Sequence, residues 1–384
     1  MDSLTVSGVL RRFLPDYLRE RRPVTPAQRR AIFAITHCRT AVMGGHVHVC
    51  GDCGTREFAY HSCNHRSCPQ CGRGATFEWV QRELGKRIGA PYYMVTFTLP
   101  EDLRALFFSK AAPDVHHVFF TAASRALAAA LAGPRWLGAA TSGFTMVLHT
   151  WNQRLLFHPH LHCIVPGAGL DARGRIVVVK NENFLVPQPV LRRAFRERFR
   201  ALLGELAAKD PDLPAVDGAV WEKDWGVHLQ PFGGGERAIQ YLGAYVSRTA
   251  IGDSRIVGVE GDRVMFRWKD RANGGAPRIE TLTGVEFIRR YLRHVLPRGM
   301  KAIRHYGFCH PAAKASRAII AAALGTALPP APADTPPVPP RTCPCCGLSM
   351  SIVVRLLPAR RLTGQEAPFA ARPPPTLAAA RSCA

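Results

Sequence analysis

The sequence predicts an α+β fold, in which a small cysteine-rich module precedes a larger body built from an antiparallel or mixed sheet flanked by helices. Two observations support this prediction. Short segments rich in β-branched and aromatic residues alternate with longer amphipathic segments over residues 91–310. Cysteine, histidine and glycine are concentrated in residues 37–73, which show little periodicity, as in small modules that are held together by a metal ion.

The chain of 384 residues is predicted to contain three domains. Residues 1–90 combine a basic helical lead-in, interrupted at Pro23 and Pro26, with the cysteine-rich module and a helix over residues 75–87. Residues 91–310 form the body, with strands expected at 92–99, 143–150, 158–165, 175–180 and 263–268, and helices at 112–131, 190–208, 236–249 and 284–296. Residues 311–384 form a tail rich in proline and alanine, with a short helix, a linker and the motif CPCCG at residues 343–347.

The charge balance favours a polyanionic partner. The sequence has 51 Lys and Arg residues against 28 Asp and Glu residues, a formal net charge of +23, and nucleic acid is the commonest partner for such a surplus. A basic surface that serves solubility and a protein of membrane surfaces are the alternatives.

The most apolar stretch, residues 318–328, is shorter than the roughly 20 residues of a membrane span, and no secretory signal is visible at the N-terminus. We therefore expect no membrane partner and a cytoplasmic, nucleoid-associated protein.

Two Cys-x2-Cys pairs predict a structural zinc site. The first pair is Cys50 and Cys53, the second is Cys68 and Cys71, and fourteen residues separate them. In a reducing compartment, clustered cysteines more often bind metal than form disulfides, and two such pairs complete a closed tetrahedron of thiolates around zinc. We expect one structural Zn²⁺ held by these four residues.

Other cysteines and histidines could form a second zinc site. Cys38, His46 and Cys63 are the candidates, and the alternative is that they are ordinary residues of a small core. The CPCCG motif is half of a zinc ribbon whose second half is missing downstream, where Cys383 is the one remaining cysteine. A zinc ion at this motif would need ligands from elsewhere in the chain, and the sequence does not predict one there.

Three histidines alternate along the predicted strand at residues 158–165. His158, His160 and His162 share one face, and positions two apart are roughly 6–7 Å apart at Cα, so two imidazoles can converge on one ion. Buried imidazoles need hydrogen-bond partners, which makes packing a poor explanation for three of them on one face. We predict a metal site with His160 and His162 as the best pair, and with His158 or His149 of the preceding strand as third ligand. No glutamate lies nearby in the sequence as a base, which disfavours a metalloprotease.

Two tyrosines and an arginine lie on one face of the predicted helix at residues 236–249. Tyr241 and Tyr245 are four residues apart, and Arg248 follows three residues later. Two aromatic rings that pack on a core are the ordinary interpretation of such a pair. Beside a metal-binding strand on a basic chain, the hydroxyl groups can instead attack a phosphodiester, with the arginine neutralising the developing charge.

Together these motifs resemble a known family, the two-tyrosine transposases of rolling-circle insertion sequences (the insertion-sequence ninety-one type) within the HUH endonuclease superfamily. The resemblance covers about residues 10–310 and the CPCCG motif, and it rests on the segments CRTAVMGGHVHVCGDCG…SCNHRSCPQC at 38–71, HTWNQRLLFHPHLHCIVPGAGL at 149–170, YLGAYVSR at 241–248 and RRYLRHVLPRGMKAIRHYGF at 289–308. It implies that His160 and His162 form the His-hydrophobic-His motif for catalytic Mg²⁺ or Mn²⁺, and that Tyr241 and Tyr245 are paired nucleophiles. The fold it implies is a central antiparallel sheet that carries the histidines, with the tyrosine helix packed beneath it.

The expected function is that of a bacterial DNA transposase, an enzyme that nicks single-stranded DNA at the ends of a mobile element. A tyrosine would form a 5′-phosphotyrosine, leave a 3′-hydroxyl and pass the strand to target DNA. The chain lacks a G-x-x-x-x-G-K-[ST] loop, which agrees with chemistry that needs no nucleotide triphosphate. The alternatives are a plasmid rolling-circle replication initiator or relaxase with the same chemistry, and a non-catalytic zinc protein that binds DNA.

Overall fold

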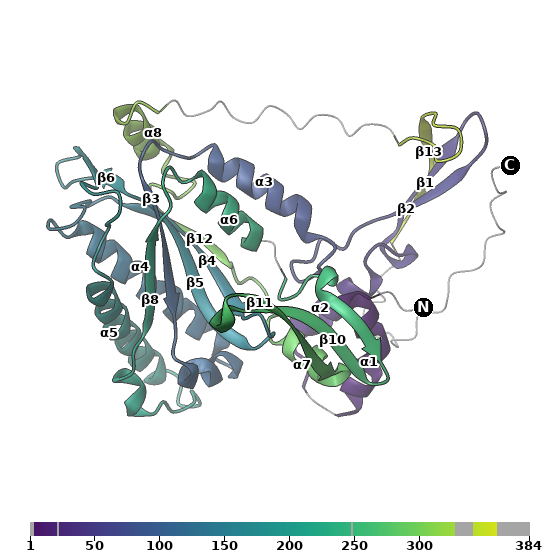
Figure 1. Cartoon of the computed structure of the whole chain (residues 1–384), viewed down its shortest axis with the longest axis horizontal. Helices are drawn as coiled ribbons and strands as arrows, with labels where there is room; N and C mark the ends of the chain where they lie inside the picture. The colour runs from purple at the N-terminus through teal and green to yellow at the C-terminus, as the bar shows by residue number, and fades with distance from the viewer. Residues whose placement is uncertain (1–3, 21–22, 247–248, 327–340, 359–384) are drawn as a thin grey trace.

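The computed structural model describes residues 4–20, 23–246, 249–326 and 341–358. Within these ranges, one large sheet carries helices on both faces, and two smaller three-stranded sheets lie beyond one end of it (Figure 1). The expected α+β class, with antiparallel pairing and a cysteine-rich module near the N-terminus, is confirmed.

The central sheet has five strands in the order β12-β4-β5-β3-β8, and every neighbouring pair is antiparallel. Alternation along β5 directs Leu161 and Cys163 toward one face of the sheet, and His160 and His162 toward the other. The five strands are β3 (Tyr92–Thr98), β4 (Gly143–Trp151), β5 (Phe157–Pro166), β8 (Gly226–Pro231) and β12 (Ile303–Gly307). The bounds of β3, β4 and β5 agree with the sequence prediction to within one residue at each end, whereas β8 and β12 were not predicted.

Two long helices, α4 (Ala112–Ala132) and α5 (Gln188–Ala207), cover one face of the central sheet (Figure 1). They enclose the largest core of the molecule, in which Phe97, Leu161 and Phe195 are fully buried. Among the described helices, α4 alone is long and apolar enough to cross a membrane by length and composition. Of its most apolar window, 67% is buried inside the protein, which is the pattern of a core helix.

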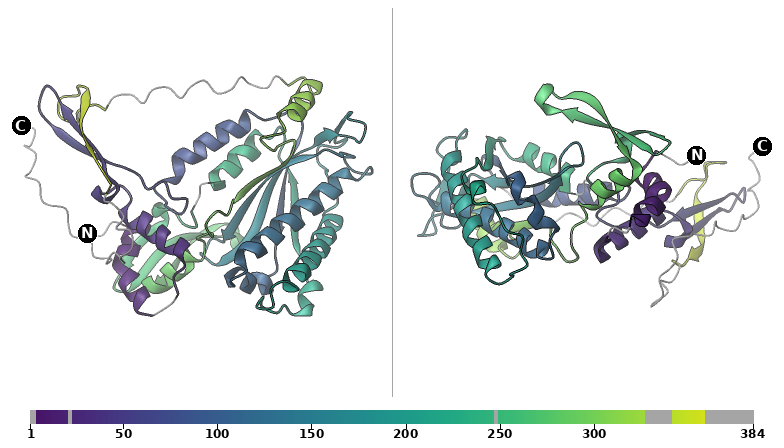
Figure 2. Two further views of the ribbon diagram at one scale, coloured as in Figure 1. Left: turned by 180° about the vertical axis from the view of Figure 1, so that it is seen from behind. Right: turned by 90° about the horizontal axis from the view of Figure 1, so that it is seen from below.

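Three shorter helices cover the opposite face, which is also the face that carries the histidines (Figures 1 and 2). They bury Trp79, Leu242 and Ile320 against the sheet. The helix expected at 75–87 begins and ends three residues earlier, and the end of the helix expected at 236–249 falls on residues 247–248, which lie outside the described ranges. The three helices are α3 (Gly72–Leu84), α6 (Glu236–Val246) and α8 (Lys314–Ala323).

The helices of the basic lead-in share a hydrophobic core with residues 250–292, so their contacts cross the predicted domain boundary at residue 90. Pro26 begins the second helix, because Thr25 and Gln28 form a reciprocal capping box around its first turn. A Cβ at Gly284 would lie 2.1 Å from the ring of Phe13, so glycine permits the close packing of the first helix. The elements of this unit are α1 (Val6–Arg19), α2 (Pro26–His37), β9 (Ile256–Glu260), β10 (Arg263–Asp270), β11 (Ala276–Thr283) and α7 (Gly284–Leu292).

The second small sheet joins two segments that lie far apart in the sequence. Its central strand β1 (Gly45–Cys50) pairs with β2 (Arg56–Tyr60) on one side and with β13 (Met350–Leu356) on the other, antiparallel in both cases. Within the predicted tail domain over residues 311–384, α8 packs on the central sheet and β13 pairs with the cysteine-rich module. Pairing across about 300 residues leaves no local signal in a sequence.

The remaining elements are short. β6 (Ala168–Leu170) and β7 (Ile176–Val178) form a hairpin, of which β7 is the core of the strand expected at 175–180. Short 3-10 segments occur at η1 (Ala41–Met43), η2 (Glu101–Phe108), η3 (Gly218–Trp221), η4 (Asp253–Arg255) and η5 (Arg271–Asn273).

Candidate active site

Three histidines converge on one face of the central sheet. His149 of β4 stands opposite His160 of β5 in the strand register, and His162 follows two residues later on the same face. One imidazole nitrogen from each of the three lies within 4.8 Å of the others. Of the two candidates for third ligand, His149 is therefore the one that is grouped with His160 and His162. His158 lies outside this group, and its Nδ1 is 3.3 Å from Nη2 of Arg104.

The surroundings of the histidines orient them as neutral ligands. Nδ1 of His160 donates a hydrogen bond to the carbonyl of His158 at 2.7 Å, which leaves Nε2 with its lone pair for an ion. Nδ1 of His162 lies 3.2 Å from Oγ1 of Thr96. Burial lowers the pKa of His160 to about 4 and the pKa of His162 to about 3, so both rings are uncharged near neutral pH, the form that binds metal.

The tyrosine helix α6 packs against β3, β4 and β5 beside the histidines. The ring of Tyr241 meets that of His162 edge-on at 6.5 Å between centroids, and Tyr241 is 37% exposed. A Cβ at Gly243 would lie 2.0 Å from Cγ2 of Val80, so this glycine lets α6 approach α3 closely. Tyr245 follows one turn later in the same helix, and its side chain lies outside the described part of the structure, as does all of Arg248.

Eight cysteines form two clusters of four, each with sulfur atoms within 4.8 Å of one another. In a tetrahedral four-thiolate zinc site the sulfurs are about 3.8 Å apart, and the measured Sγ separations of 3.4–3.6 Å are close to that value. The prediction that Cys50 and Cys53 share one zinc ion with Cys68 and Cys71 is wrong. The β1–β2 hairpin carries the first pair away from the start of α3, next to which the second pair lies (Figure 1). The clusters are Cys38, Cys63, Cys68 and Cys71, and Cys50, Cys53, Cys343 and Cys346.

Comparison with known proteins agrees with these features. Residues 143–317 match a family model described as "Putative transposase", and residues 9–99 match one described as "Transposase zinc-binding domain". The chain is 39% identical over 318 residues to the "Putative transposase y4qJ" of Sinorhizobium fredii, covering 79% of each chain. It belongs to the transposases of the insertion-sequence ninety-one type. It is also 29% identical over 297 residues to the "Transposase for insertion sequence element IS801" of Pseudomonas savastanoi pv. phaseolicola, covering 71% of this chain and 67% of the other. No solved structure matches the chain.

The zinc-binding domain of this transposase contains six of the eight clustered cysteines, which supports structural Zn²⁺. Cys38 follows α2 and Cys71 directly precedes α3, so the first cluster joins two helices to the loop between them. His46, predicted with Cys38 and Cys63, is not in that cluster: its Nδ1 lies 3.3 Å from Nε2 of His61 in the β1 region.

Sequence reasoning missed one charged residue that acts electrostatically on the histidines of the transposase. Burial is the main cause of the lowered pKa of His160 and of His162, and the positive charge of Arg271 is the last and smallest of the further causes. Arg271 lies in η5 at the end of β10, in the three-stranded sheet. No local pattern in the sequence could have identified it.

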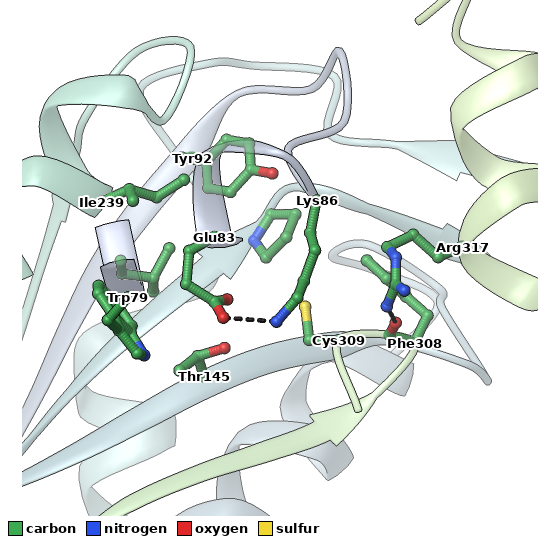
Figure 3. A pocket seen from close by; sticks show the side chains of 11 residues that line it. Trp79, Glu83, Lys86, Tyr92, Thr145, Ile239, Phe308, Cys309 and Arg317 are labelled. Atoms are coloured by element: carbon green, nitrogen blue, oxygen red, sulfur yellow. Dashed lines mark hydrogen bonds and ion pairs between the residues drawn. The ribbon is translucent and has the colours of Figure 1, made fainter. Parts of the chain in front are cut away.

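A small pocket lined by apolar and charged side chains lies on the same face of the central sheet, between α3, α8 and β4 (Figure 3). Lys86 pairs there with Glu83 at 2.5 Å, and Arg317 donates a hydrogen bond to the carbonyl of Phe308 at 3.1 Å. The pocket has a volume of about 30 Å³, room for about one water molecule. The bond from Arg317 joins α8 to the residue that follows β12, and a pocket of this size leaves no space for a substrate.

Proposed function

We propose that this transposase breaks a phosphodiester bond of single-stranded DNA with a tyrosine of α6, beside a divalent ion held by His149, His160 and His162. The observation that carries the proposal is the convergence of three imidazoles next to the exposed ring of Tyr241. The net charge of +23 supports a DNA partner, here the single strand at the element's ends and the target DNA. A cytoplasmic, nucleoid-associated location follows from such a partner.

The donor set fits a six-coordinate divalent ion. His149, His160 and His162 would hold the ion through three imidazole nitrogens, and phosphate oxygens and water would complete its shell. Imidazole is a softer ligand than Mg²⁺ prefers, so the site suits Mn²⁺ better than Mg²⁺. When bound, the ion would polarise the phosphate oxygens and make the phosphorus more electrophilic.

The side chains of the chain itself supply the nucleophile and part of the positive charge. The hydroxyl of Tyr241 or Tyr245 attacks phosphorus and loses its proton, the bond from phosphorus to the 3′-oxygen breaks, and that oxygen leaves as a 3′-hydroxyl. The product is a 5′-phosphotyrosine, which keeps the energy of the broken bond until a 3′-hydroxyl attacks it and restores the tyrosine. Arg248, three residues beyond Tyr245 in the chain, neutralises charge on the phosphate.

Two tyrosines one turn apart allow two covalent events in turn. A tyrosine that already holds the donor strand cannot cut the target, whereas its neighbour on the same helix can. The proposal therefore assigns both residues as nucleophiles of one exchange reaction. A replication initiator or relaxase would use the same first step, but the Sinorhizobium and Pseudomonas relatives are both named transposases.

The test is a covalent-adduct assay. The purified transposase is incubated with Mn²⁺ or Mg²⁺ and a labelled single-stranded oligonucleotide that carries the element's end, and the adduct is measured on a denaturing gel. We expect Tyr241→Phe and Tyr245→Phe each to keep partial adduct formation and the double variant to form none. Each single variant should abolish transposition in cells. Phenylalanine keeps the ring, so loss of packing cannot explain the result.

A second arm of the assay separates binding from chemistry. His160→Ala with His162→Ala should remove the adduct while single-strand affinity, measured by fluorescence anisotropy, changes by less than about threefold, because affinity rests mainly on phosphate contacts to Lys and Arg. If the wild-type protein cleaves the oligonucleotide but forms no covalent adduct, the nucleophile is water and not a tyrosine, and the proposal is overturned.

A further inference from the structure

The two halves of the second cysteine cluster have the same backbone geometry. In the hairpin turn, the amide of Gly54 donates to the carbonyl of Cys50 at 3.1 Å, and the amide of Cys50 donates to the carbonyl of Thr55 at 3.0 Å. The C-terminal motif repeats both bonds at the same spacing, from Gly347 to Cys343 at 2.9 Å and from Cys343 to Leu348 at 2.7 Å. Both glycines adopt positive φ, 69° and 74°. Two matched turns of this kind present two sulfurs each toward a common centre.

The sulfurs of the two turns face one another. Sγ of Cys50 lies 3.4 Å from that of Cys346, and Sγ of Cys53 lies 3.5 Å from that of Cys343. All four are free thiols within 4.8 Å of one another. We propose that Cys50, Cys53, Cys343 and Cys346 bind a second zinc ion, separate from that of the first cluster, which fastens the C-terminal segment to the zinc-binding domain.

Packing alone gives the C-terminal segment little support. The buried cluster at this place consists of Cys50, Cys343 and Met350, whereas Ile352 and Val353 of β13 are each 56% exposed. The backbone pairing of β13 with β1 sets the register that brings Met350 opposite Cys50. In modules this small, metal binding supplies the free energy of folding that a core cannot.

The second zinc site changes the boundaries of the zinc-binding domain. The matched family model ends at residue 99, so it includes two of the four ligands and excludes the C-terminal pair. The cysteine-rich module of this chain is therefore assembled from two segments, one before β3 and one after β12, and residues 341–358 are part of it.

The first test is the zinc content of the full-length protein, measured by mass spectrometry of the metal after purification in reductant. We expect two zinc ions per chain, and one in Cys343→Ser with Cys346→Ser. Cys345→Ser is the matched control, because it alters the same motif outside the four-sulfur group, and it should keep two. One zinc in the wild-type protein, or two in the double variant, would overturn the proposal.

The second test asks whether zinc holds the segment in place. A protease site is inserted between residues 327 and 340, the full-length protein is cleaved under reducing conditions, and the retention of the C-terminal fragment is followed by native size-exclusion chromatography. We expect the fragment to stay bound, and to be released by a zinc chelator or in the Cys343→Ser, Cys346→Ser variant. Release in the presence of zinc, or retention after chelation, contradicts the proposal. Neither test depends on DNA cleavage.

Discussion

The histidine site and the cysteine sites of this transposase are assembled by different rules. The histidines come from two neighbouring strands of one sheet, where alternation and register decide which side chains meet. The cysteine clusters instead join segments that are not neighbouring strands: the first joins two helices and the loop between them within residues 38–71, and the second joins residues about 300 positions apart in the sequence. The difference teaches that a strand pattern is local information, whereas a Cys-x2-Cys pair can be completed by any other pair of ligands.

The largest effect that would test this contrast concerns the two cysteine clusters. If they are independent, Cys50→Ser and Cys68→Ser each remove a different zinc ion, and the double variant removes both. Structural zinc contributes roughly 10–16 kcal/mol in small modules, so each variant should unfold its own part of the zinc-binding domain while the central sheet stays folded. Zinc content and limited proteolysis measure this, with Cys309→Ser as the control outside both clusters. If the double variant loses no more zinc than either single one, the two residues share one site and the division into two clusters is wrong.

A smaller expected effect tests which histidine is the third ligand of the metal ion. His149→Ala should slow adduct formation by about 100-fold or more, since it removes one of three ligands from the ion. His158→Ala is the matched control on the same face. It keeps the backbone carbonyl that orients His160 and should change the rate by less than about threefold. Rates are compared at several Mn²⁺ concentrations. If His158→Ala slows adduct formation more than His149→Ala does, His158 and not His149 is the third ligand.

The sequence identified the elements whose evidence is local. The strands that carry His149 and His160 were predicted to within one residue at each end, because they are rich in β-branched, aromatic and other apolar residues. Edge and hairpin strands such as β12 and β13 were missed, since their residues show no clear period and their pairing depends on distant partners. The same limit hid Arg271 and left Cys343 without an assigned partner.

The contact between α3 and α6 connects the two regions and gives the smallest expected effect. α3 begins next to Cys71 of the first zinc cluster, and α6 carries Tyr241 beside the histidines. A Cβ at Gly243 would lie 2.0 Å from Cγ2 of Val80, so Gly243→Ala must push the two helices apart.

We expect Gly243→Ala to destabilise the protein by about 2 kcal/mol, the usual cost of overpacking, and to slow adduct formation as Tyr241 moves relative to His162. Gly204→Ala is the matched control, because it is also a glycine inside a helix, and a Cβ there would meet no neighbouring atom within 4 Å. That change should stabilise the protein by about 0.5–1 kcal/mol, since alanine is the better helix former, and leave the cleavage rate unaltered. Thermal unfolding and the adduct assay measure both variants. If Gly243→Ala lowers stability but cleaves at the wild-type rate, the zinc-binding domain does not position the tyrosine through α3, and the two regions act independently in catalysis.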